Sequence, residues 1–191
     1  MEKISNYQII GITGGLGKGL LHRTRDQIPK CLLKIGNKAL IDYYIELYSK
    51  YTKDFVFLLG HLGEQIQDYI SNGSKWGIKP KFSIEKEALG KGGAIKNALE
   101  KGIIDRKRPC IIHYPDDLII RPNFPLQLIR RHSDGIKKGA LATLVKVEKT
   151  RYRYGVPRSS SDGFVFDFKE KPWVTEPASV GVYVLQPDVY R

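Results

Sequence analysis

A glycine-rich segment, "GGLGKG" at residues 14–19, directly follows the apolar run "YQIIGIT" at residues 7–13. The backbone N–H groups of such a turn after a strand can surround an anion, most often a phosphate. Pro29 and Lys30 follow, and the lysine would add a positive charge near the turn. These residue types and their spacing indicate phosphate chemistry.

Two familiar phosphate loops do not fit the segment. A Walker A loop would need glycine at position 12 and a hydroxyl residue at position 19, where Ile12 and Gly19 stand. A dinucleotide fingerprint would need glycine at position 20 or 22, where Leu20 and His22 stand. The phosphate would therefore belong to another class of ligand.

A second candidate group is the pair Asp116 and Asp117, within the apolar stretch "PCIIHYPDDLII" at residues 109–120. Carboxylate oxygens suit a hard cation such as Mg²⁺. An isolated aspartate pair can also form a turn or cap a helix, so the pair alone leaves both interpretations open.

Strand and helix patterns alternate along the chain, which predicts βαβ units and a mostly parallel sheet. Ligands of such sheets bind beyond the carboxyl ends of the strands, where the glycine segment, residues 85–93 and the aspartate pair all fall. Two short strands joined by "SSSDG" are expected within residues 154–169. The other predicted strands cover residues 7–13, 54–60, 79–85, 109–120, 139–147 and 178–186, and the predicted helices cover residues 38–51, 62–73, 90–102 and 124–133, with a further helical turn from Pro187.

The composition is that of a globular protein: the 191 residues are 41% hydrophobic and 27% charged. No signal peptide and no apolar run of membrane-spanning length is visible, so we expect a cytoplasmic protein with no membrane partner. Cys31 and Cys110 are too few and too far apart for a zinc motif.

The net charge of +12 raises the alternative of a basic RNA-binding protein. The lysines and arginines are scattered, with the densest patches at residues 106–108 and 151–158, and no nucleic-acid-binding motif is present. We therefore expect no nucleic-acid partner and interpret the charge as a solvated surface that also suits a polyanionic small substrate.

Four stretches in order resemble the sugar-1-phosphate nucleotidyltransferases. Residues 14–46 are similar to the family pattern G-G-x-G-T-R-L-x-P-x-T followed by P-K, and "EKEALGKGGAIKNAL" resembles E-x-x-x-L-G-T-A-G-A-I. "IIHYPDDLI" resembles the metal-aspartate strand, and "RYGV", "FKEKP" and "ASVGVYVL" resemble the sugar-binding half. The resemblance runs from about residue 8 to 188. The motifs "PDD" and "ASVGVYVL" are similar to those of the UTP–glucose-1-phosphate uridylyltransferase branch.

The resemblance implies a three-layer, Rossmann-like (GT-A-like) α/β domain with a mostly parallel mixed sheet. Residues 1–191 would form one domain, with a nucleotide-binding half at 1–120 and a sugar-binding half at 121–191. It implies an enzyme that transfers a nucleoside monophosphate from UTP or dTTP to a sugar 1-phosphate, with Mg²⁺ as cofactor. The resemblance to the uridylyltransferase branch implies that this sugar 1-phosphate is glucose 1-phosphate. The products would be a nucleoside diphosphate sugar and pyrophosphate.

The resemblance also assigns roles to individual residues. The catalytic residues would be Lys30, Asp116 and Lys171, with Asp116 as the metal ligand. The nucleotide would be bound by Thr13, Gly14, Gly15, Gly17, Lys18, Glu85 and Gly90. The sugar phosphate would be bound by Asp117, Tyr154, Gly155, Glu170, Lys171 and Ser179.

Two departures from the family pattern support an alternative function. Lys18 and Gly19 stand where the family has Thr-Arg, and the family's second metal aspartate would lie beyond residue 191, so we expect the sugar-binding half to be incomplete at its C-terminus. The alternative is a catalytically impaired relative that binds a nucleotide or nucleotide sugar in a regulatory or partner-subunit role. Self-association into a homo-oligomer is compatible with either function.

Overall fold

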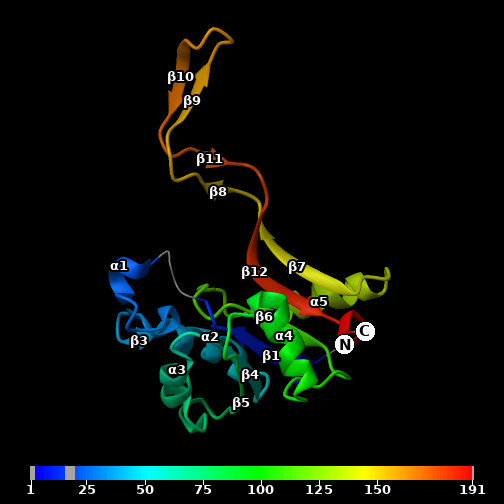
Figure 1. Ribbon diagram of the computed structural model, residues 1–191. Coiled ribbons are helices and arrows are strands. Elements are labelled where there is room, and N and C mark those ends of the chain that lie inside the picture. The colour runs from blue at the N-terminus through cyan, green and yellow to red at the C-terminus, as the bar shows by residue number, and fades with distance from the viewer. Residues whose placement is uncertain (1–2, 16–19, 191) are drawn as a thin grey trace. The chain divides into compact units, whose positions relative to one another are not determined.

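The computed structural model describes residues 3–15 and 20–190 (Figure 1). The chain divides into two compact units. The first comprises residues 1–143 and 181–191 and contains the core of the central sheet, and the second comprises residues 144–180. The predicted division into a nucleotide-binding half and a sugar-binding half stays a prediction.

The central sheet has six strands. In sheet order its strands are β5 (Lys79–Ile84), β4 (Asp54–Leu59), β1 (Gln8–Ile12), β6 (Cys110–His113), β12 (Ala178–Leu185) and β7 (Ala142–Val147). The β5–β4, β4–β1 and β1–β6 pairs are parallel, whereas β12 runs antiparallel to β6. The predicted mostly parallel mixed sheet is confirmed.

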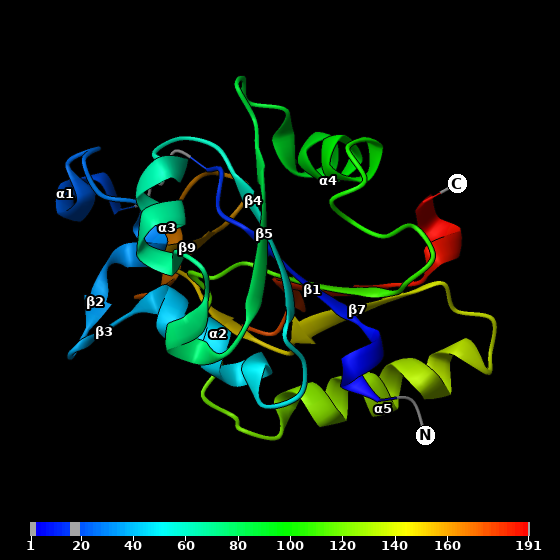
Figure 2. The same ribbon diagram turned by 90° about the horizontal axis from the view of Figure 1, so that it is seen from below.

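Helices cover both faces of this sheet because its central strands are apolar on both sides. Successive residues of a strand point to opposite faces, so Ile10 packs toward Ala94 and Ala98 on one face, while Phe57 contacts Tyr44 on the other. Figure 2 shows α4 on one side of the central strands and α2 and α5 on the other. The helices are α1 (Leu21–Thr24), α2 (Leu40–Ser49), α3 (Gly63–Ile70), α4 (Gly90–Glu100) and α5 (Phe124–Ile136), with short 3-10 turns at Ile4–Asn6, Lys30–Leu32, Ser74–Trp76 and Pro187–Tyr190.

Two-stranded ladders complete the structure. In the first unit β2 (Lys34–Ile35) pairs with β3 (Lys38–Ala39). In the second unit β8 (Thr150–Arg151) pairs with β11 (Trp173–Val174), and β9 (Val156–Ser159) pairs with β10 (Val165–Lys169). The Gly163 N–H donates to Ser160 O at 3.0 Å, which confirms the predicted turn between two short strands.

Two predicted strands differ from the structure by three or more residues at one end. The strand expected over residues 109–120 ends at His113, because residues 114–117 form a turn that includes Pro115, which has no N–H to donate to a ladder. The strand expected from residue 139 begins at Ala142, because residues 137–139 form the turn that follows α5 and Gly139 has a φ of 85°. The aspartate pair therefore lies on a turn after the strand.

None of the helices in the described part of the chain is both long and apolar enough to cross a membrane.

Gly181 gives a test of the packing between β12 and the turn after β6. It has a φ of 71°, and a Cβ there would lie 2.2 Å from Cδ2 of Tyr114. We expect Gly181→Ala to lower the free energy of unfolding by about 3 kcal/mol, combining the backbone strain with overpacking. Urea denaturation monitored by circular dichroism measures this change.

The matched control is Gly139→Ala. Gly139 has a φ of 85°, but nothing lies within 4 Å of a Cβ added there. It should cost only the backbone strain, about 1 kcal/mol. Equal losses in the two variants would contradict the packing argument.

Candidate functional site

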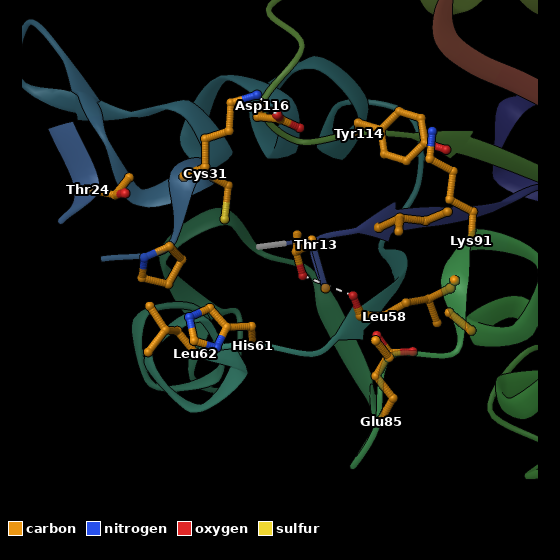
Figure 3. A pocket seen from close by; sticks show the side chains of 18 of the residues that line it. Thr13, Thr24, Cys31, Leu58, His61, Leu62, Glu85, Lys91, Tyr114 and Asp116 are labelled. Atoms are coloured by element: carbon orange, nitrogen blue, oxygen red, sulfur yellow. Dashed lines mark hydrogen bonds and ion pairs between the residues drawn. The ribbon is translucent and has the colours of Figure 1, made fainter. Parts of the chain in front are cut away.

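A pocket of about 650 Å³ lies at the carboxyl ends of the parallel strands (Figure 3). Its walls come from the segments after β1, β4, β5 and β6 and from the start of α4. Nine of the residues that line it are Thr13, Gly14, Gly15, Lys30, Glu85, Gly90, Lys91, Asp116 and Asp117. The pocket lies at the edge of the sheet where we expected the ligand site, and its binding of a ligand stays a prediction.

The glycine segment closely approaches the neighbouring loops. A Cβ on Gly14 would lie 2.8 Å from Oε1 of Glu85 and 3.2 Å from the Gly60 nitrogen, so a larger residue would push these loops apart. The Thr13 hydroxyl donates to Leu58 O at 3.0 Å and holds the segment against β4. Gly17 and Lys18, like Gly19, lie outside the described residues.

The Glu85 carboxylate stands between the glycine segment and the start of α4. The backbone N–H of Glu85 continues the sheet by donating to Leu59 O at 2.9 Å. The Leu89 N–H donates to Oε2 of Glu85 at 3.4 Å and closes the loop before Gly90, which has a φ of 70°. The structure thus brings Glu85, Gly14 and Gly90, which we predicted to bind a nucleotide, into one wall of the pocket.

Lys30 and Asp116 form an ion pair through Nζ and Oδ2, although they are 86 residues apart in sequence. The side chains are 35% and 23% exposed, so both remain accessible from the pocket. Burial and the neighbouring Asp116 raise the pKa of Asp117, while Lys30 and Lys91 act in the opposite direction. The structure therefore unites the predicted phosphate-binding lysine with the predicted metal aspartate.

The residues of this pocket suit a hard cation better than a soft one. Burial, together with the negative charge of Asp116, raises the pKa of the adjacent Cys31 thiol to about 12, which opposes formation of the thiolate that a soft cation prefers. The described residues contain no group of three potential protein ligands. Mg²⁺ is commonly bound by one or two carboxylates together with substrate phosphates, so Asp116, flanked by Asp117, fits this mode of binding.

Lys91 and Tyr114 are pocket residues that the sequence did not indicate. Figure 3 shows them side by side, and Lys91 Nζ lies 4.9 Å from the centre of the Tyr114 ring. This cation–π contact holds the ammonium beside Asp117 without pairing it to a carboxylate in the described structure. The only sequence signal was a lysine at position 91, where the family pattern has threonine.

Most of the predicted sugar-binding residues belong to the second unit. A Cβ on Gly155 would lie 3.0 Å from Oε2 of Glu170, and Lys171 Nζ lies 3.4 Å from Oε1 of Glu170. Gly155, Glu170 and Lys171 are therefore neighbours, while Tyr154 is exposed. The sugar-binding role of these three residues, of Tyr154 and of Ser179 stays a prediction.

Comparisons with known proteins agree with this architecture. The family model described as "Nucleotidyl transferase" matches residues 9–191. The D-glycero-alpha-D-manno-heptose 1-phosphate guanylyltransferase of Aneurinibacillus thermoaerophilus is 32% identical over 186 residues, which are 96% of this chain and 76% of that protein. The UTP–glucose-1-phosphate uridylyltransferase of Synechocystis sp. is 27% identical over 180 residues, which are 85% of this chain but only 45% of that protein.

Solved structures share the fold. A Bacillus anthracis protein described as a glucose-1-phosphate thymidylyltransferase superimposes with a TM-score of 0.68 at 17% identity, covering 96% of this chain and 73% of that one. A UDP-glucose pyrophosphorylase complexed with UDP-glucose gives a TM-score of 0.65 at 22% identity, covering 96% and 77%. With the family model matching nearly the whole sequence, the chain belongs to the nucleotidyl transferase family.

Proposed function

We propose that this chain is a sugar-1-phosphate nucleotidyltransferase. The observation that carries the proposal is the pocket in which Lys30 and Asp116 meet opposite the glycine segment and Glu85. An enzyme that positions a nucleoside triphosphate requires a cationic side chain, a carboxylate that can bind a metal and a glycine-lined wall. The relatives that match this chain support the same class of reaction.

In the proposed reaction, an oxygen of the sugar 1-phosphate attacks the α-phosphorus of the triphosphate. The new P–O bond forms as the bond to the bridging oxygen breaks, and pyrophosphate leaves with the electron pair. Lys30 would bind phosphate oxygens, and Asp116 would hold Mg²⁺, which neutralises phosphate charge when bound. Asp117, Tyr154, Gly155, Glu170, Lys171 and Ser179 would bind the sugar phosphate.

Binding of the triphosphate and its metal would replace the ion pair between Lys30 and Asp116 with contacts from each residue to the ligand. In the ligand-free structure the Lys30 ammonium neutralises the Asp116 carboxylate. A triphosphate–metal complex brings both an anion for the lysine and a cation for the aspartate. The ion pair would then separate without leaving either charge unpaired, which favours joint binding of metal and nucleotide.

For the nucleotide and sugar, we propose UTP or dTTP and glucose 1-phosphate, by resemblance to the uridylyltransferase branch. Glu85 favours GTP as a second candidate, because an ionised carboxylate only accepts hydrogen bonds. Guanine offers adjacent N–H donors on one edge, whereas the single N–H of uracil is flanked by two carbonyl oxygens. Relatives named as guanylyltransferases support the same candidate.

A catalytically impaired, nucleotide-binding relative with a regulatory or partner-subunit role is the alternative function. It is favoured by Gly19, which stands where the family pattern has arginine. Such a protein would still bind nucleotide in the pocket but would release no pyrophosphate.

A coupled pyrophosphate-release assay over a panel of nucleoside triphosphates and sugar 1-phosphates tests the proposal. We expect turnover with one pair of substrates, reduced at least about 100-fold in Asp116→Asn because a charge contact in the transition state is lost. Asp134→Asn, on the exposed side of α5, is the charge-matched control and should leave turnover unchanged. Nucleotide binding by calorimetry without turnover on any pair would favour the impaired relative.

The identity of the base can be tested at Glu85. If GTP is the substrate, Glu85→Gln should lower the ratio of kcat/KM for GTP to that for UTP by about 10- to 100-fold, because one bidentate contact discriminates by about 1–3 kcal/mol. Glu87→Gln, two residues further along, controls for the loss of charge. An unchanged ratio in Glu85→Gln would exclude this carboxylate as the reader of the base.

The proposed exchange of partners can be tested with the metal alone. Without nucleotide, Lys30→Met should bind Mn²⁺ about five times more tightly than the wild type, because the ammonium no longer competes for Asp116. The same variant should bind the triphosphate more weakly. Electron paramagnetic resonance of Mn²⁺ measures the first effect, and Lys38→Met, which removes an ion pair with Glu46, is the control. Weaker Mn²⁺ binding in Lys30→Met would contradict the exchange.

A further inference from the structure

We propose that His113 is a positioning residue that fixes the Asp116–Asp117 turn through a buried chain of hydrogen bonds from Tyr48. The inference rests on the proposed function, because it assigns His113 a role in presenting the metal aspartate. His113 is the last residue of β6 and is only 1% exposed. It lines no part of the pocket, so its role would be carried by the turn.

The two ring nitrogens of His113 have different partners. Nε2 lies 2.9 Å from the carbonyl oxygen of Asp117, and Nδ1 lies 3.1 Å from the hydroxyl of Tyr48. A carbonyl oxygen can only accept, so Nε2 carries the hydrogen and donates it. Nδ1 of the neutral ring is then an acceptor, and the Tyr48 hydroxyl donates to it.

The orientation of the ring is also fixed by its neighbours. Tyr44 and Tyr48, one helical turn apart in α2, make edge contacts with the imidazole at centroid distances of 5.3 and 5.7 Å. Tyr48 is fully buried, so its hydrogen bond to Nδ1 lies away from solvent, where an unmade bond is costly. The helix α2 thereby sets the direction in which His113 donates.

The backbone of the turn at residues 114–117 is restricted by its own hydrogen bond, by Pro115 and by the neighbouring strand. The Asp117 N–H donates to Tyr114 O at 2.9 Å, and Pro115 restricts the backbone at the second position. A Cβ on Gly11 would lie 3.1 Å from Cγ of Pro115, so β1 supports the turn from the neighbouring strand. With the Asp117 carbonyl held by His113, both backbone groups of Asp117 are bound, and the side chain of the preceding residue, Asp116, pairs with Lys30.

Three variants separate this role from simple packing. His113→Leu removes the donor and keeps an apolar side chain, whereas His113→Gln supplies an amide N–H that can reach the same carbonyl. Tyr48→Phe removes only the hydroxyl that orients the ring. His132→Leu is the matched control, because His132 is also fully buried and hydrogen-bonded, through Thr143 and Gln186, on α5.

The readouts are Mn²⁺ affinity of the folded protein and kcat for pyrophosphate release, with urea denaturation to measure stability. We expect His113→Leu to weaken Mn²⁺ binding about tenfold and to lower kcat more than it changes KM for the triphosphate, as loss of precise positioning does. His113→Gln should restore most of both, and Tyr48→Phe should have an intermediate effect. His132→Leu should lower stability while leaving Mn²⁺ affinity and kcat unchanged.

Equal Mn²⁺ affinity in wild type, His113→Leu and Tyr48→Phe would overturn the inference, as would His113→Gln behaving like His113→Leu at equal stability. If His113→Leu does not fold, the comparison of Tyr48→Phe with the wild type decides. Absence of Mn²⁺ binding by the wild type would also overturn the inference that His113 positions the metal aspartate. Mn²⁺ binding without pyrophosphate release from any substrate pair would instead overturn the proposed function alone.

Discussion

The parallel pairing of β1 with both β4 and β6 is the constraint on which the site depends. It places the carboxyl ends of three strands at one edge, so that the segments after them meet although they are distant in sequence. Ile9 and Ile10 of β1 are fully buried on opposite faces, and burial of each such side chain stabilises the fold by about 1.5–3 kcal/mol. The strand therefore combines burial on both faces of the sheet with the alignment of the pocket walls.

Charge balance is the second organising feature of the pocket. The described residues that line it include the carboxylates of Asp26, Glu85, Asp116 and Asp117 and the ammonium groups of Lys30 and Lys91. The Lys30–Asp116 pair is partly exposed, so it contributes little to stability and can be exchanged for ligands at low cost. Around this locally acidic site the chain as a whole carries a net charge of +12, which would attract a polyanionic substrate over a longer range.

Behind the pocket, buried polar groups take the place of a purely apolar core. Burial lowers the pKa of His113 to about 4, which keeps the ring neutral so that it can both donate and accept. Polar groups inside a protein must be paired to avoid a desolvation cost of about 1–3 kcal/mol each. Such a network has one favourable arrangement, and this rigidity suits a turn that must present a carboxylate in a single direction.

The sequence by itself determined the alternation of strands and helices, because apolar periodicity is a local signal carried by neighbouring residues. It also indicated Gly14, Lys30, Glu85 and Asp116, since their motifs are short and ordered, and the structure places all four at one pocket. It extended the strand before Asp116 too far, because an apolar run does not show where a ladder ends. Gly17 and Lys18 lie outside the described residues, and the sugar-binding assignments in the second unit remain predictions.

Only the tertiary structure decided which distant side chains touch. The pairing of Lys30 with Asp116 joins residues 86 positions apart, and no local pattern encodes the meeting of Lys91 with Tyr114. His113 looked like one more residue of an apolar strand until the fold placed Tyr48 against one nitrogen and the Asp117 carbonyl against the other. Residue spacing predicts local conformation, whereas hydrogen-bond partners across elements depend on how the helices pack on the sheet.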